Sequence, residues 1–178
     1  STFNRGVVDG QPILINYSSE LGLHKYGAFF QVSRKLAQDK LTLSAGLAFD
    51  GADFGPTMNN PLDQASPRAS MSWNFFGPLS FNANVGRYYQ HPTYTVLGFR
   101  DELGNLVNRD NGIRYIRADH AVGGFEYNSK INTKITVEGF YKDYDNYPFL
   151  IRDSIALANL GADFGVIGDE PAIPTGEG

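Results

Sequence analysis

The sequence predicts an all-β fold, in which antiparallel, up-and-down strands form a segment of a large transmembrane β-barrel with long extracellular loops. Three observations lead to this fold class. Apolar and polar residues alternate along six segments, the connections between those segments are short and long in turn, and the polar positions carry few charges. Because successive side chains of an extended chain point to opposite faces, the alternation indicates strands.

Each predicted strand has one apolar and one polar face. The second strand, for example, sets Leu41, Leu43 and Leu47 opposite Thr42 and Ser44. The six strands are expected at residues 26–33, 41–49, 68–75, 79–86, 121–128 and 135–142. The third and fourth are joined by a Gly-Pro turn and form a hairpin.

The connections alternate in length along the chain. The short ones are 34–40, 76–78 and 129–134, and the long ones are 50–66, 91–117 and the residues from 145 onward. In a membrane barrel, short periplasmic turns alternate with long extracellular loops. In a soluble β-sandwich both ends of a sheet face water, so loop length need not alternate. The pattern therefore favours the barrel, and a soluble β-sandwich module that binds a ligand such as a carbohydrate is the alternative.

The composition of the two faces supports the same interpretation. The polar face is rich in Ser, Asn, Gln, Gly and Thr, which suits an enclosed polar lumen. Aromatic residues gather toward strand ends, with Trp73, Phe75 and Phe76 beside the Gly-Pro turn and Tyr88 and Tyr89 at the opposite end. Such clusters are typical of the aromatic girdles at the two membrane interfaces.

Composition also excludes several classes of function. A net charge of −4 argues against nucleic acid as a partner, and the absence of cysteine rules out disulfides and thiolate metal sites. No apolar run approaches the roughly 18 residues of a membrane-spanning helix. His24, His91 and His120 lack metal-ligand spacing, and no nucleophile motif occurs, so we expect no metal, no cofactor and no enzyme activity.

Two motifs have simpler interpretations than catalysis. "GADFG" occurs at 51–55 and again at 161–165, without the other segments of a kinase, and is expected to form loop turns. Asp143 and Asp145 are spaced like the paired carboxylates of a glycosidase, but nothing in the sequence raises the pKa of one of them. They are expected to be polar residues at a strand-to-loop junction.

Three segments together resemble the barrel region of TonB-dependent outer-membrane receptors. They are "SPRASMSWNFFGPLSFNANVGRYYQHPTY", "VEGFYKDYDNYP" and "IALANLGADFGVIGDEP", and the resemblance runs from about Lys25 to Glu170. It implies an outer-membrane barrel of about 22 strands, closed by a plug domain, that binds and imports a nutrient such as a siderophore, carbohydrate or peptide. No plug-like stretch is found, so residues 1–178 are expected to be a fragment of one receptor barrel domain with about six membrane-spanning strands.

The resemblance also implies the partners. These are an inner-membrane energy-coupling protein, reached through the plug, outer-membrane lipid and lipopolysaccharide, and the nutrient itself, with a surface lipoprotein as a further candidate.

Ligand contacts are expected at the top of the lumen and in the loop that follows. By strand parity, Tyr88 and Gln90 share the polar face with Asn82 and Asn84. The candidate ligand-binding residues are Tyr88, Gln90, His91, Tyr94, Arg100 and Arg109. Aromatic rings and guanidinium groups suit the capture of a sugar, peptide or chelate by stacking and paired hydrogen bonds.

Acidic and amide side chains also cluster in two of the long loops. They are Asp50, Asp53, Asn59, Asn60 and Asp63 in the first, and Asp101, Asn105, Asn108, Asp110 and Asn111 in the second. Their spacing does not match a calcium-binding loop. We expect them to be solvated residues at the loop tips.

Overall fold

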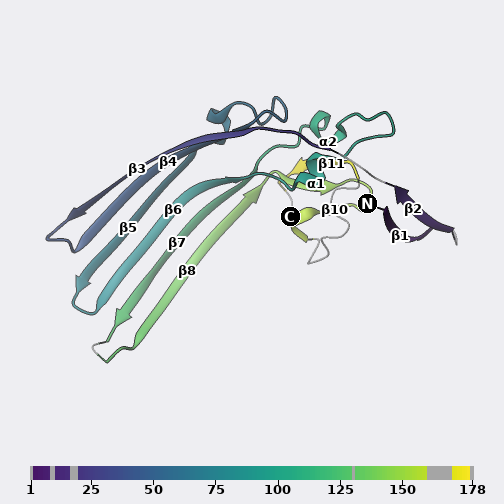
Figure 1. The fold of residues 1–178 in the computed structure, drawn as a ribbon. Helices are drawn as coiled ribbons and strands as arrows, with labels where there is room; N and C mark the ends of the chain where they lie inside the picture. Colours follow the sequence, from purple (N-terminus) through teal and green to yellow (C-terminus); the bar gives the residue numbers. More distant parts are fainter. Residues whose placement is uncertain (1, 9–10, 17–19, 130, 160–169, 177–178) are drawn as a thin grey trace.

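A computed structural model of the chain describes residues 2–8, 11–16, 20–129, 131–159 and 170–176. Its main feature is one six-stranded antiparallel sheet in which every strand pairs with its neighbours in the sequence (Figure 1). The strands are β3 (Lys25–Leu36), β4 (Leu41–Ala52), β5 (Ser66–Phe76), β6 (Leu79–Gln90), β7 (Ile116–Asn128) and β8 (Lys134–Asp145). The six predicted strands are therefore confirmed, and each is longer than its alternating core.

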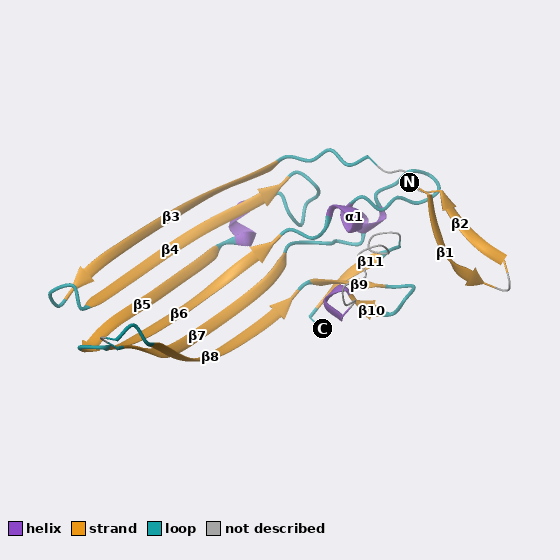
Figure 2. Cartoon of the chain, turned by 60° about the horizontal axis from the view of Figure 1, so that its bottom comes forward, coloured by secondary structure: helices purple, strands orange, loops and turns teal. Residues whose placement is uncertain are grey.

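Smaller elements lie beside this sheet (Figure 2). A hairpin pairs β1 (Thr2–Val8) with β2 (Gln11–Asn16), and a second small sheet has the order β10-β9-β11. Its strands are β9 (Tyr147–Leu150), β10 (Ile155–Ala156) and β11 (Ala172–Thr175), and the short helices are η1 (Pro61–Gln64), α1 (Tyr94–Leu97), α2 (Val107–Asp110) and η2 (Leu157–Asn159). No helix in the described part of the chain is long and apolar enough to cross a membrane.

Short turns and long loops lie at opposite ends of the sheet, as the alternation in length predicts (Figure 1). The turn after β3 is closed by Ala37, Gln38 and Asp39, which adopt φ angles of 52°, 58° and 66°. Gly77 has a φ of 44° in the turn after β5, a conformation that glycine adopts without steric cost. Both turns are tight enough to return the chain directly to the neighbouring strand.

The register aligns the faces of all six strands. Leu43 on β4 pairs with Met71 on β5, Met71 with Ala83 on β6, and Ala83 with Gly123 on β7. On the opposite face, Ser44 pairs with Ser70. One surface of the sheet is therefore apolar and the other polar, because the alternation is in phase from strand to strand.

No part of the described chain covers the apolar face. Phe30 and Val137 are each 68% exposed, and Phe125 is 52% exposed. Full burial of one such side chain contributes about 1.5–3 kcal/mol relative to water, so a surface of this extent needs an apolar environment. Strands of 11–13 residues are also long enough to cross a bilayer, which takes about 9–11 residues.

Aromatic rings gather on this face at the turn end. Trp73 lies 5.2 Å from Phe75, and Phe125 lies 5.0 Å from Phe81, measured between ring centroids. The predicted girdle beside the Gly-Pro turn is thus present on three adjacent strands.

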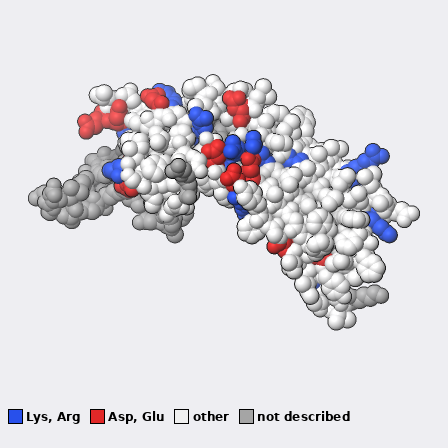
Figure 3. Space-filling view, turned by 180° about the vertical axis from the view of Figure 1, so that it is seen from behind, with Lys and Arg blue, Asp and Glu red and all other residues white. Residues whose placement is uncertain are grey.

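A row of ion pairs crosses the same face at the loop end. Arg87 donates two hydrogen bonds to Asp119, at 2.7 and 2.9 Å, and Arg117 lies 3.5 Å from Asp119 and 3.1 Å from Asp145. Figure 3 shows such a charged cluster between the uncharged surface of the strands and the loops. Asp145 is therefore a junction residue, as expected, and the row marks the end of the apolar band.

The hydrophobic core of the described chain lies in the long loops. We call residues 52–65, 91–115 and the described part of 146–176 the loop cap. Its buried side chains include Phe54, Met58, Leu97, Ile113 and Leu150. Three loops that are distant in sequence therefore pack on one another at the loop end of the sheet.

Asn108 corrects the expectation that the polar loop residues are all solvated. Its side chain is fully buried, donates to the carbonyls of Val96 at 2.7 Å and Glu170 at 3.3 Å, and accepts from the amide of Ala172 at 2.7 Å. It therefore links two loops.

Asp101 behaves as expected, because its exposed carboxylate accepts from the amides of Leu103 and Asn105 within one turn.

We predict that the two faces meet different solvents. Single cysteines at Leu43, Phe81 and Val137, labelled with a nitroxide in the membrane-embedded protein, should be relaxed by oxygen, which concentrates in the bilayer. Labels at Ser44, Asn82 and Glu138 should respond instead to a water-soluble nickel chelate. The chain has no native cysteine to interfere. Equal responses at the paired positions would contradict the assignment of the faces.

We also predict that Asn108→Ala loosens the loop cap. The change removes the acceptor of the buried Ala172 amide, and a buried donor without a partner costs about 1–3 kcal/mol. It also removes one donor each from the carbonyls of Val96 and Glu170. Hydrogen exchange should show faster exchange at Ala172 while strand amides in β5 and β6 stay protected. Asn105→Ala, in an exposed turn, is the control and should leave exchange at Ala172 unchanged.

Candidate ligand-binding surface

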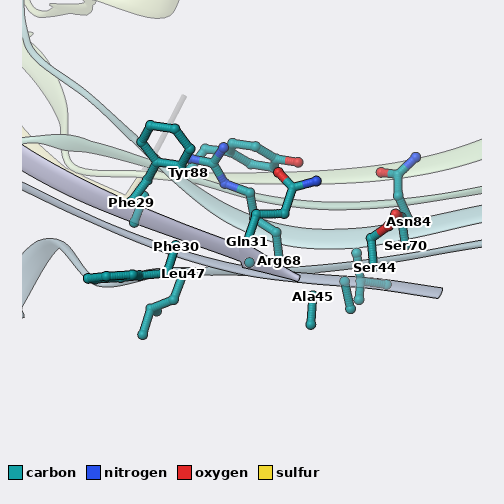
Figure 4. A pocket seen from close by; sticks show the side chains of 14 residues that line it. Phe29, Phe30, Gln31, Ser44, Ala45, Leu47, Arg68, Ser70, Asn84 and Tyr88 are labelled. Atoms are coloured by element: carbon teal, nitrogen blue, oxygen red, sulfur yellow. The ribbon is translucent and has the colours of Figure 1, made fainter. Parts of the chain in front are cut away.

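A hollow of about 190 Å³ lies on the polar face of the sheet, over β3 to β6. Figure 4 shows Gln31, Arg68 and Tyr88 on one side of the ribbon, and Ala45 and Leu47 on the other. The polar-face residues that line the hollow are Phe29, Gln31, Ser44, Gly46, Ala48, Arg68, Ser70, Asn84 and Tyr88. They supply aromatic surface, one guanidinium and several neutral hydrogen-bonding groups.

Arg68 and Tyr88 are stacked on each other in the lining of this hollow. The guanidinium carbon of Arg68 lies 4.7 Å from the centroid of the Tyr88 ring, within range of a cation–π contact. Gly86 makes the stacking possible. A Cβ at this position would lie 3.0 Å from the Tyr88 hydroxyl and 3.2 Å from Cγ of Arg68.

The aromatic surface continues from Tyr88 across the next two strands. Its ring lies 5.0 Å from that of His120, His120 lies 5.9 Å from Tyr144, and Tyr144 lies 5.7 Å from Tyr147. We call Arg68, Tyr88, His120, Tyr144 and Tyr147 the aromatic row. It runs from β5 to β9 and ends at Tyr147, in the loop cap.

A second hollow, of about 570 Å³, opens at the loop end of the sheet. Strand β5 begins at Ser66, opposite Ala48, so β4 and β6 extend past it with no strand between them. The lining residues are Lys25, Tyr26, Gly27, Asp50, Tyr89, Gln90, His91 and Tyr115. The ring of Tyr26 packs over Gly51, and its hydroxyl donates to the carbonyl of Asn59, which ties β3 to the first long loop.

His91 is held at the wall of this second hollow. Its ring lies 5.2 Å from that of Tyr94 and 5.5 Å from that of Tyr115, and Nδ1 is 2.7 Å from the carbonyl oxygen of Pro92. Nδ1 therefore carries the proton and donates, while Nε2 is buried without a partner in the described chain. Burial lowers the pKa of His91, because it penalises the charged ring.

Tyr115 is the second buried titratable group at this wall. Burial is the main reason that its pKa rises to about 12, and the nearby Asp50 carboxylate adds to the effect. Its hydroxyl thus stays protonated at any physiological pH. His91 and Tyr115 therefore present neutral groups to the hollow, while Lys25 and Asp50 supply the charged groups of its lining.

The structure brings four of the six sequence-predicted residues to these hollows. Tyr88 lines the first, Gln90 and His91 line the second, and Tyr94 packs against His91. Arg100 instead donates to the carbonyls of Gly104 and Glu20, at 2.6 and 3.2 Å. None of these contacts tests ligand binding, so the six residues remain predicted contacts.

Arg109 also lies in the loop cap, away from the hollows. Its Nε lies 3.5 Å from Asp110, and its aliphatic chain passes beside Gly55. This environment is that of a residue packing within a loop.

Sequence reasoning did not identify Arg68, Gln31, His120 or Tyr144 as ligand-facing. The signal was available in part, since Arg68 occupies a polar position of its strand. Their proximity depends on the register, in which Arg68 pairs with Gly86 and Gly86 with His120. Within the described ranges, no group of three His, Asp or Glu side chains could hold a metal ion.

Residues 2–168 match the model of the family described as TonB dependent receptor-like, beta-barrel. This match covers most of the chain and includes all six strands of the sheet. The chain belongs to the TonB-dependent receptor barrel family. No curated protein and no solved structure matches it.

Membership of the TonB-dependent receptor family explains the two faces of the sheet. Its barrels act in the outer membrane as receptors and transporters, and they are not enzymes. Transmembrane barrels alternate lipid-facing and lumen-facing side chains along every strand. The sheet is thus an element of a receptor barrel wall, and its loop end corresponds to the end with long extracellular loops.

We predict that the base of the second long loop opens as the pH falls. The pKa of His91 in the folded protein lies below its value of about 6.5 in an unfolded chain, so the open loop binds a proton first. The stabilisation is complete above pH 6.5 and declines as the pH drops toward the folded pKa. Amide exchange at Leu97 and Gly98, corrected for the intrinsic pH dependence, should show more opening at pH 5 than at pH 8.

His91→Phe is the control for this effect. It keeps an aromatic ring between Tyr94 and Tyr115 but cannot titrate, so the difference between the two pH values should disappear. A difference that persists in His91→Phe would assign the opening to another group.

Proposed function

We propose that this chain forms part of the wall and mouth of an outer-membrane receptor that binds a nutrient and imports it. The nutrient belongs to the siderophores, carbohydrates or peptides, and the energy comes from an inner-membrane coupling protein that acts through a plug domain. The observation that carries the proposal is the single-layer sheet with one apolar and one polar face. An uncovered apolar face suits lipid, and the polar face with its hollows suits an aqueous passage.

The two edges of the sheet support the further proposal that residues 1–178 form one segment of a larger barrel. Strands β3 and β8 each have one neighbour in the six-stranded sheet. Unpaired backbone groups at membrane depth cost several kcal/mol each, so both edges require additional strands in a bilayer. Closure by further strands of the same barrel satisfies them.

The alternative, a soluble β-sandwich, finds no support in the described residues. A sandwich requires a second sheet packed against the first. The small sheet of β9, β10 and β11 lies at the loop end, within the loop cap, and the apolar residues of the large sheet stay exposed.

Gene deletion in the producing bacterium tests the proposal. The deletion strain should lose growth on one compound from a panel of ferric siderophores, oligosaccharides and peptides, and the protein should fractionate with the outer membrane. Because transport draws on the inner-membrane proton gradient, an uncoupler should stop uptake of that compound while surface binding persists. Recovery of the protein in the soluble periplasm, or uptake that continues in the presence of the uncoupler, would contradict the proposal.

A further inference from the structure

The polar face carries a basic, aromatic patch without carboxylates. Arg68 pairs with Gly86, Gly86 with His120, and His120 with Lys142, so three basic side chains lie in one cross-strand row. The adjacent rows on either side contain aromatic, hydroxyl and amide side chains. Acidic residues on this face lie at Asp50 toward the loops and at Glu126 and Glu138 toward the turns, and Glu126 is paired with Lys134.

This composition departs from that of the whole chain. The sequence has 19 acidic and 15 basic residues, so a random polar surface of this size would include carboxylates. On the apolar side, Arg87 and Arg117 are both paired with aspartates. On the polar side, Arg68 faces the ring of Tyr88, and the ammonium of Lys142 lies 5.5 Å from the ring of Phe140. A bound anion would neutralise the positive charges of Arg68 and Lys142, which contact aromatic rings and no carboxylate in the described part of the protein.

The rings of the patch are accessible. Phe29 is 77% exposed and Phe140 is 72% exposed, although both lie on the polar face. Tyr88, His120 and Tyr144 fill the space between β6 and β8 with contiguous rings. Flat apolar surface beside basic groups suits a ligand whose negative charge sits on or next to an aromatic ring.

The size of the hollow limits which part of a ligand it accepts. Whole small-molecule sites usually have volumes of about 300–1,000 Å³, and an apolar cavity of about 150 Å³ holds one benzene molecule. The hollow of about 190 Å³ between Phe29 and Tyr88 therefore fits one substituted ring. The remainder of a larger ligand would extend along the aromatic row toward Tyr144.

We propose that the patch formed by Phe29, Arg68, Tyr88, His120 and Lys142 is a subsite for an anionic aromatic group of the imported ligand. The guanidinium of Arg68 binds the negative oxygen atoms, the ring stacks between Phe29 and Tyr88, and Gln31 and Asn84 donate to ring substituents. This inference rests on the proposed function, because it takes the polar face to line the passage. It selects an anionic, ring-bearing ligand over a neutral sugar or peptide.

Three probes distinguish the ligand classes in calorimetric titrations of the purified full-length receptor. They are a trianionic ferric catecholate, a neutral ferric trihydroxamate of similar size without rings, and maltohexaose. The catecholate should bind most tightly, and its affinity should fall as salt is raised, since the attraction is between charges. Failure of the catecholate to bind, or preferential binding of maltohexaose or of the trihydroxamate, would overturn the assignment.

Substitutions then locate the binding. Arg68→Gln should weaken catecholate binding by about tenfold or more, because it removes a charged donor, and Lys142→Gln should weaken it severalfold. Arg34→Gln removes the same charge from the apolar face, where Arg34 pairs with Leu43, and should leave the affinity within about twofold. Equal losses of catecholate affinity in Arg34→Gln and Arg68→Gln would show that binding depends only on the net charge of the protein, and would overturn the subsite.

Gly86→Ala tests the stacking without removing any side chain. The added methyl group would press on Tyr88 and Arg68, and should weaken catecholate binding severalfold. Gly139→Ala is the matched control, because its added methyl group would meet no atom within 4 Å. If uptake remains energy-dependent while all these variants bind like the wild type, the subsite is wrong and the proposed function stands. If uptake ignores the uncoupler, the proposed function itself fails.

Discussion

The structure depends on one constraint, which is that a single-layer sheet must satisfy two solvents at once. Each strand satisfies its backbone groups through its neighbours, so the side chains alone decide what each face meets. Phe30, Phe125 and Val137 lie uncovered on one face, while Ser44, Asn82 and Asn84 occupy the other. The ion pairs of Arg87 and Arg117 then end the apolar band at the loop side. This division gives the sheet its place in the membrane and gives the polar face its access to ligand.

The loop cap follows a different physical principle from the sheet. It has a conventional hydrophobic core around Leu97, Ile113 and Leu150, and the buried side chains of Asn108 and Glu170 hydrogen-bond to specific partners. Asn108 joins two loops through three hydrogen bonds, and the buried carboxylate of Glu170 accepts from the amides of Arg152 and Asp153. The loop cap supplies one side of the second hollow, where the ring of His91 packs against those of Tyr94 and Tyr115.

The sequence predicts the sheet well because apolar and polar residues alternate along membrane strands with a period of two, and one face of each strand meets lipid. That pattern gives the strands, their faces, the parity of the loops and the aromatic cluster near Trp73. It does not predict β9, β10 and β11, which have two to four residues each and are too short for a period to appear. The position of Tyr88 is also not that of a simple membrane-girdle residue, since its ring stacks on Arg68 over the polar face.

Long-range pairing explains what the sequence does not reveal about the candidate site. Asn108 reads as a solvated loop residue until Ala172, 64 positions later, is placed beside it. Arg68, His120 and Lys142 are scattered over 75 positions and become one row only through the register of four strands. Of the two "GADFG" turns, the second lies outside the described residues, and the first contains the buried Phe54 of the loop cap.

Quenching of the fluorescence of Trp73 tests the central claim most directly. It is the only tryptophan of the chain and lies on the apolar face near the turns, where its side chain is 46% exposed. The difference signal between the wild-type protein and Trp73→Phe isolates its emission in the full-length receptor. In bilayers of brominated lipids, that emission should be strongly quenched, most of all by bromines near the headgroups, while aqueous iodide should have little effect. Quenching by iodide with no response to brominated lipid would place Trp73 in water and contradict the account.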